Sequence, residues 1–100
     1  MSVTLSHGED SSCVRLEGAI DIAGAAEMKT VLLEALNRRR PVKVALDGVT
    51  GLDITAVQLL WAAQHEAERA GVGFDFAGPI PETVFAALNG AGLGDVLRIP

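Results

Sequence analysis

The stretch that decides the fold is residues 42–60, which read VKVALDGVTGLDITAVQLL. Its first part, 42–46, is apolar and β-branched, which predicts a short strand that is central in a sheet. Residues 47–52 predict a loop because glycines interrupt the pattern there. Asp53 then stands where an N-cap belongs, so we expect a helix from that point to about Ala70, ended by Gly71. The stretch therefore predicts a strand, a loop and a capped helix.

Toward the N-terminus the same kinds of signal recur. Residues 3–5 and 13–16 alternate apolar and polar side chains around the polar cluster 8–12, which predicts a β-hairpin. Gly18 closes it, and Asp21 is placed to cap a helix over 22–39 whose apolar residues recur at steps of three and four. Those apolar positions are Ile22, Ala25, Met28, Leu32, Leu33 and Leu36.

Toward the C-terminus, residues 73–77 alternate as a strand, and 82–88 predict a short third helix. Residues 96–99 fit a last edge strand. The expected order is β-β-α-β-α-β-α-β, in which helices connect successive strands and impose crossovers. This order predicts an α/β fold with a mixed four- to five-stranded sheet and helices packed mainly on one face, as a single domain over 1–100.

The totals set limits on the class of protein. The chain has 100 residues, 49% of them hydrophobic, enough for one core and too apolar for disorder. No uncharged apolar run reaches membrane-spanning length, and the polar, acidic first ten residues do not fit a signal peptide. The net charge of −5, concentrated in the second half, disfavours a nucleic-acid partner. With a single cysteine, Cys13, no internal disulfide forms, and the cytoplasm is the expected compartment.

Motifs for catalysis or a cofactor are missing from the sequence. His7 and His65 have no metal-ligand spacing to another His or Cys, and both are interpreted as surface residues. The glycine run 90–94 follows a helix, where it caps, whereas a phosphate loop opens one. The arginines 38–40 complement the dipole at a helix C-terminus. Neither an enzyme nor a bound cofactor is expected.

The helix expected after Asp53 is the informative element. A helical wheel at about 100° per residue separates two apolar sets. The expected core face comprises Ala56, Leu59, Leu60, Ala63, Ala67 and Ala70. A second strip comprises Ile54, Val57 and Trp61, among the polar residues Gln64, His65 and Glu68. An amphipathic helix with one core needs no second strip, so it indicates either an interaction surface or packing of Trp61 under a loop or the first helix.

The chain as a whole resembles the STAS domain, a family named for sulfate transporters and anti-sigma-factor antagonists. The resemblance rests on the order of elements and on residues 44–60, in which a strand and a loop lead through Asp53 into a Leu-rich helix. Gly18–Asp21 resembles the family's Gly-x-x-Asp, and the Gly92-Leu93 pair resembles its Gly-Leu after the third helix. The resemblance implies a non-catalytic domain that binds a partner kinase, which phosphorylates the hydroxyl residue directly after the motif's Asp.

This sequence departs from that pattern at the residue that matters most. The position after Asp53 is Ile54, which has no hydroxyl, and the family's glycine is replaced by Ala56. Thr55 is the candidate phosphorylation site, but it lies about 100° around the helix from Ile54. A phosphate there would add nearly two negative charges beside Asp53. We expect the usual switch to be absent or displaced.

Two functions follow from the resemblance. The first is a cytoplasmic, bacterial-type adaptor that binds a kinase-like anti-sigma factor or another signalling protein and carries no cofactor. The alternative is an accessory subunit of an ABC-type membrane transport complex that docks on the ATPase; direct membrane insertion is not expected, and a homodimer is compatible with both. The expected partner-binding residues are Asp21, Asp53, Ile54, Thr55, Val57 and Trp61.

Overall fold

The computed structural model describes residues 2–8, 10–90 and 92. The elements in chain order are β1 (Ser2–His7), β2 (Ser12–Ile20), α1 (Ile22–Asn37), β3 (Val42–Leu52), α2 (Ile54–Ala70), β4 (Phe74–Ala77) and α3 (Glu82–Gly90). The expected edge strand at 96–99 lies outside the described residues. Each predicted element within them is present.

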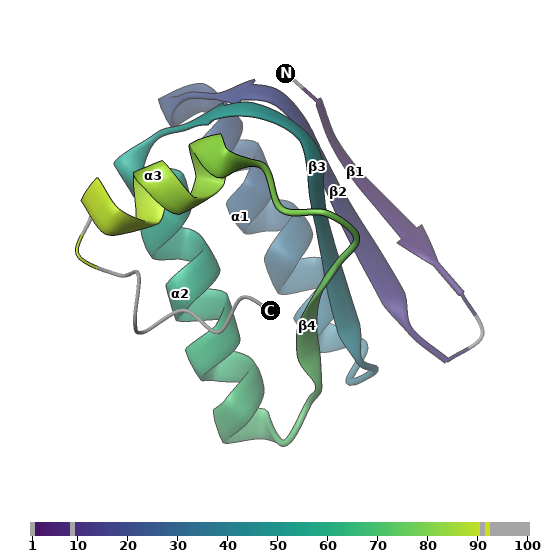
Figure 1. Cartoon of the computed structure of the whole chain (residues 1–100). Helices are drawn as coiled ribbons and strands as arrows, with labels where there is room; N and C mark the ends of the chain where they lie inside the picture. Colours follow the sequence, from purple (N-terminus) through teal and green to yellow (C-terminus); the bar gives the residue numbers. More distant parts are fainter. Residues whose placement is uncertain (1, 9, 91, 93–100) are drawn as a thin grey trace.

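The strands form one four-stranded sheet in the order β1-β2-β3-β4. β1 and β2 pair antiparallel as a hairpin, whereas β2 with β3 and β3 with β4 are parallel pairs. α1 and α2 lie side by side on one face of this sheet, and α3 lies across one end of the molecule (Figure 1). The predicted fold class, a mixed sheet with helices mainly on one face, is confirmed.

The core lies between the sheet and the helices because the strands alternate in exposure. On β2 and β3 the inward side chains are buried, and the outward face carries charged groups such as Arg15 and Asp47, which form an exposed ion pair of 2.8 Å. The inward side chains of the two central strands are Val14, Leu16, Ile20, Val42, Val44, Leu46 and Val49. Small residues on the helices, including Ala25, Ala56 and Ala63, let both helices lie close to the sheet.

Several predicted boundaries differ from the observed ones. Gly18, which was expected to close the hairpin, lies within β2, and this strand continues to Ile20. Residues 47–52 are not a loop, since β3 continues to Leu52. The pairing of β2 with β3 extends to Ile20 opposite Leu52, with register shifts between Arg15 and Glu17 and between Gly18 and Ala19. Gly48 and Gly51 are paired in this register, with Glu17 and Ala19. The first helix ends at Asn37 rather than Arg39, because Arg39 takes a left-handed backbone angle, φ 55°, that no helix continues through.

Candidate partner-docking site

The parallel pairing of β2 with β3 brings two helix starts together. The strands end opposite each other at Ile20 and Leu52, and the backbone N–H of Asp53 donates to the carbonyl of Ile20 at 2.9 Å. Because the carboxyl ends of parallel strands meet at one edge of a sheet, the next residues, Asp21 and Asp53, are neighbours at that edge.

Both aspartates cap the helices that follow them. The Asp21 carboxylate accepts from the backbone N–H of Gly24 at 2.9 Å, and the Asp53 carboxylate accepts from that of Thr55 at 2.8 Å. Each has an extended backbone, as an N-cap requires, so each satisfies one of the N–H groups left free at a helix start. The role expected of these aspartates as helix caps is confirmed, whereas their contact with a partner stays a prediction.

The first residue of each helix is an exposed isoleucine. Ile22 is 70% exposed and Ile54 is 54% exposed, although both belong to helices that bury one apolar face against the core. Ile22 is one of the apolar positions that recur at steps of three and four along the first helix, but it lies on the surface, as Leu33 does at 50% exposure. At the first helical position a side chain lies beyond the sheet edge, so wheel position alone does not bury it. We call Asp21, Ile22, Asp53, Ile54 and Thr55 the cap edge.

Val57 does not belong to an exposed strip. It is 0% exposed and is part of the core cluster, so the expectation that it lies beside Ile54 and Trp61 on the surface is wrong. The buried residues of α2 are Ala56, Val57, Leu60, Ala63, Gln64 and Ala67. This arc is rotated by roughly 50° from the expected one, about half of the 100° step between successive residues.

The rotation has a physical cause in the neighbours of α2. The helix contacts α1 along one flank and α3 and β4 elsewhere, so it is not a helix lying alone on a sheet. Val57 and the polar Gln64 turn into the core, while Leu59 is only half-buried and Ala70 is exposed on the flank that faces α1. A helical wheel shows which residues of a helix are apolar. It does not show from which side a second helix packs against them.

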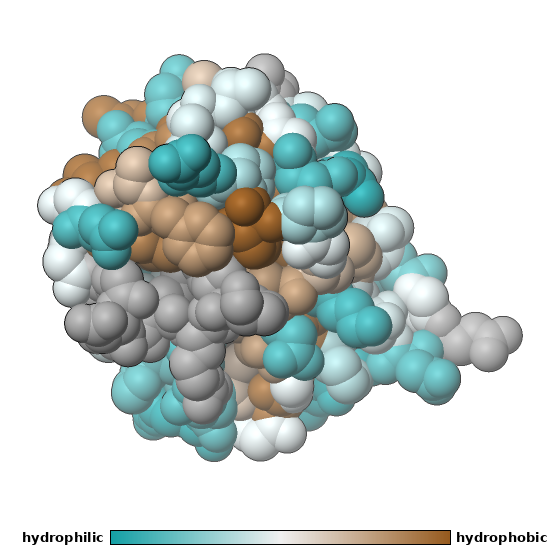
Figure 2. Space-filling view, in the orientation of Figure 1, coloured by the Kyte–Doolittle hydropathy of each residue, from teal (hydrophilic) through white to brown (hydrophobic). Residues whose placement is uncertain are grey.

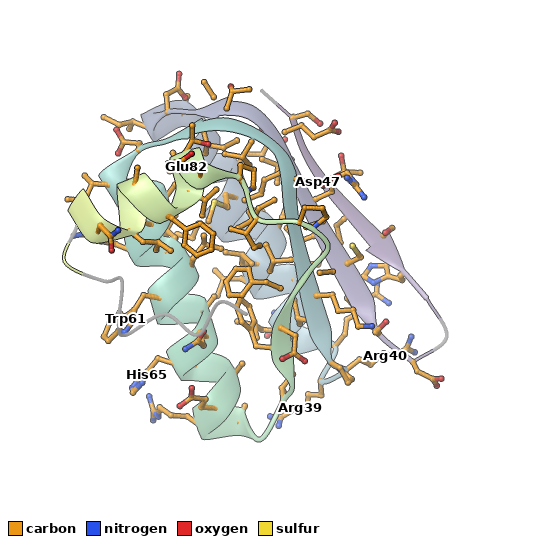
Figure 3. All side chains as sticks on the ribbon, in the orientation of Figure 1. Arg39, Arg40, Asp47, Trp61, His65 and Glu82 are labelled. Atoms are coloured by element: carbon orange, nitrogen blue, oxygen red, sulfur yellow. The ribbon has the colours of Figure 1, made fainter. Side chains whose placement is uncertain are left out.

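Trp61 lies on the outer side of α2, beside His65 one turn further along the same helix. It is 38% exposed, and its ring stacks on that of His65 with centroids 5.6 Å apart and planes 10° from parallel. Both side chains project from the same side of α2 in Figure 3. His65 is exposed, as expected. The stack holds the indole against the helix surface and leaves part of it open to contact.

Further apolar surface lies on α3. The hydroxyl of Thr83 donates to the carbonyl of Val49 at 3.4 Å, which fixes the start of α3 over the end of β3. Phe85 on this helix is exposed. Figure 2 shows apolar side chains gathered over α3 with hydrophilic ones around them. Sequence reasoning passed over Phe85, although an aromatic residue in a chain with 4% aromatics was a signal.

Side chains that could support other chemistry are few in the described part of the chain. His7 Nδ1 lies 3.1 Å from the hydroxyl of Ser12, a buried residue at the hairpin, and Cys13 is a free thiol. No group of three or more His, Cys, Asp or Glu side chains that could hold a metal occurs within residues 2–8, 10–90 and 92. None of the helices in these ranges is long and apolar enough to cross a membrane.

The chain is thus a small α/β domain with two capped helices side by side at one sheet edge. A family model described as Mlab, STAS domain matches residues 3–98. The chain belongs to the STAS domain family, as the sequence resemblance indicated. No curated protein matches it.

Several solved structures share the fold. The protein TM1081 of Thermotoga maritima superposes with a TM-score of 0.77 at 17% identity, covering 97% of this chain and 84% of that one. The Bacillus cell fate determinant SpoIIAA, in its phosphorylated form, superposes with a TM-score of 0.73 at 17% identity. This match covers 99% of this chain and 91% of SpoIIAA. The protein Mglu superposes with a TM-score of 0.67 at 21% identity. This match covers 76% of this chain but spans only 19% of the length of Mglu. At these identities the likeness concerns the fold.

Proposed function

We propose that this domain is a non-enzymatic, cytoplasmic module that binds a protein partner through the cap edge, in the manner of an anti-sigma factor antagonist. The partner class is a kinase-like anti-sigma factor or another signalling protein. The observation that carries the proposal is Ile54, an apolar side chain that is 54% exposed immediately after the capping Asp53. Membership of the STAS family and the SpoIIAA-like fold support it.

The exposed isoleucines of the cap edge would contribute to the free energy of binding when a partner buries them. Full burial of an isoleucine contributes about 1.5–3 kcal/mol, so covering the exposed part of Ile54 contributes about 1 kcal/mol and that of Ile22 slightly more. Two such side chains beside two carboxylates form a small apolar patch with a charged rim, which is the usual composition of a protein interface. Trp61 lies further along α2 and extends this surface.

The proposal includes the loss of the usual switch. Ile54 has no group to phosphorylate, and Thr55, the nearest hydroxyl, is exposed one position further on. Its backbone N–H is already bonded to Asp53, so a phosphate on Thr55 would face the Asp53 carboxylate at close range. In this proposal, because Ile54 has no hydroxyl, binding is governed by the abundance of the partner rather than by phosphorylation of the position after Asp53.

The test is quantitative capture of the partner by immobilised full chain, with Ile54→Asp as the disrupting variant. Thr4→Asp is the matched control, because it adds the same charge at an exposed site on β1. We expect Ile54→Asp to reduce capture at least fivefold and Thr4→Asp to leave it unchanged. Equal capture by wild type and Ile54→Asp would refute the cap edge as the docking surface. Stoichiometric phosphate on Thr55 after incubation with the captured kinase and ATP would refute the absence of a switch.

A second candidate function, an accessory subunit of an ABC-type transporter that docks on the ATPase, is favoured by the same residue. An exposed isoleucine in place of a hydroxyl suits a permanent interface better than one that phosphate must break. The two candidates differ in the captured partner and in its lifetime. A transport ATPase that stays bound through a high-salt wash supports the transporter subunit, whereas a kinase that dissociates within minutes supports the signalling module.

A further inference from the structure

A groove of about 440 Å³ runs between α1 and α2 on the side turned away from the sheet. Its apolar lining includes Leu32, Leu33, Leu36, Leu59, Ala62 and Ala63. It does not belong to the cap edge, because none of the five cap-edge residues lines it. The orientation of α2 that buries Val57 also places Leu59 and Ala62 in the lining of this groove.

The groove is lined by matching stripes on the two helices. On α1 the lining positions follow steps of three and four from Lys29 to Asn37, and on α2 they do so from Leu59 to Ala70. Leu33 is 50% exposed, and Leu36 and Leu59 are half-buried. A helix that covers a sheet normally presents polar residues to solvent. The leucine stripe of α1, which faces Leu59 and the small alanines of α2, therefore forms an apolar surface that no other described part of the chain is seen to cover.

The charges beside the groove are unequal on its two sides. On the α1 side stand the cations Lys29 and Arg39, both exposed and neither in an ion pair within the described part of the chain. On the α2 side stands Glu66, whose carboxylate is 3.5 Å from the guanidinium of Arg69. In a chain of net charge −5, the α1 rim is thus a local site of positive charge that lacks an anion.

We propose that this groove binds an amphipathic helix of a partner protein whose apolar stripe is flanked on one side by acidic residues. The stripe from Lys29 to Asn37 spans eight residue steps, about 12 Å, which is two turns of a bound helix. A third helix packs into the groove between two others with anchors at i, i+3, i+4 and i+7. Its acidic flank lies along α1, where Lys29 and Arg39 pair with it, and its other flank lies along Glu66.

This surface is separate from the cap edge in position as well as in lining. Arg39 and Arg40 lie at the opposite end of the molecule from Glu82, at the start of α3 (Figure 3). On α2 the groove lining runs from Leu59 to Ala70, whereas the cap edge ends at Thr55, so the two surfaces share no residue. The domain has two surfaces with which to hold one large partner or two different ones.

The test uses the full chain and a labelled synthetic peptide of about 18 residues, with leucines at i, i+3, i+4 and i+7 and glutamates along one flank. Fluorescence anisotropy measures its binding. A second peptide has lysines in place of the glutamates. We expect the Glu-flanked peptide to bind at least about tenfold more tightly than the Lys-flanked one, and Lys29→Glu to abolish or reverse this preference. Lys43→Glu, an exposed charge reversal on the open face of the sheet, should leave the preference intact.

Leu33→Asp tests the apolar lining of the groove. Because Leu33 is half exposed, this variant should fold. We expect it to weaken the Glu-flanked peptide by about tenfold, whereas Ile54→Asp should not affect it. Ile54→Asp also distinguishes a failure here from a failure of the proposed function, because it acts only on the cap edge. Unchanged binding by Leu33→Asp overturns the proposal. So does saturation of the groove by dodecanoate with no peptide binding, or a dimer in sedimentation that Leu33→Asp dissociates.

Discussion

The capping carboxylate of Asp53 can be removed in two ways that separate its hydrogen bond from its charge. Asp53→Ala deletes the 2.8 Å bond from the Thr55 N–H, whereas Asp53→Asn keeps an oxygen in the same place and removes only the charge. Loss of an N-cap to alanine costs about 0.5–2 kcal/mol, and asparagine caps about as well as aspartate. Since the Asp53 bond is exposed, we expect the middle of that range, about 1 kcal/mol, for Asp53→Ala and a few tenths for Asp53→Asn.

Urea unfolding followed by circular dichroism measures both values. For a domain of this size, a loss of about 1 kcal/mol lowers the melting temperature by about 4–8 °C. Equal losses for the two variants would refute the bond as the source of stability and attribute it to the charge at the helix N-terminus. If Asp53→Asn melts as wild type does but binds its partner less well, Asp53 acts in recognition by its charge, independently of the fold.

Three further predictions concern single side chains. Val57→Ala should lower the free energy of unfolding by about 1–3 kcal/mol because Val57 is buried, whereas Ile54→Ala should change it by less than about 0.5 kcal/mol; equal effects in chemical unfolding would contradict the burial described. Arg15→Ala should cost less than about 1 kcal/mol, since its ion pair with Asp47 is exposed, and a thermal melt that shows more would indicate a further role. Gly71→Ala should cost about 1 kcal/mol because Gly71 ends α2 at φ 71°, and a melting temperature at or above that of wild type would rule out strain there.

Sequence reasoning located the helix starts because capping chemistry is local. Asp21 and Asp53 needed only their neighbours in the chain to be identified, and their bonds to Gly24 and Thr55 are as expected of N-caps. The end of β3 was missed because it depends on a distant partner. Gly48 and Gly51 signal a loop by propensity, but pairing with β2 holds them in a strand.

The candidate site was predicted unevenly for the same reason. The exposed position of Ile54 followed from its place beside the motif, while Val57 was misplaced because its burial depends on how α2 leans against its neighbours. Periodicity groups Ile22 with the apolar residues of the first helix, but the sheet ends before it and leaves it exposed. Neighbouring residues define a helix, but only tertiary packing determines which flank it exposes.

The small size of Ala62 has a consequence for comparing relatives of this chain. Ala62 lines the groove between α1 and α2, and a side chain of Leu or Phe size there would occupy much of the space that a third helix needs. Relatives that share the fold but carry a bulky residue at this position would keep the cap edge and lose the groove. Position 62 therefore sorts such relatives into those with one of the two proposed docking surfaces and those with both.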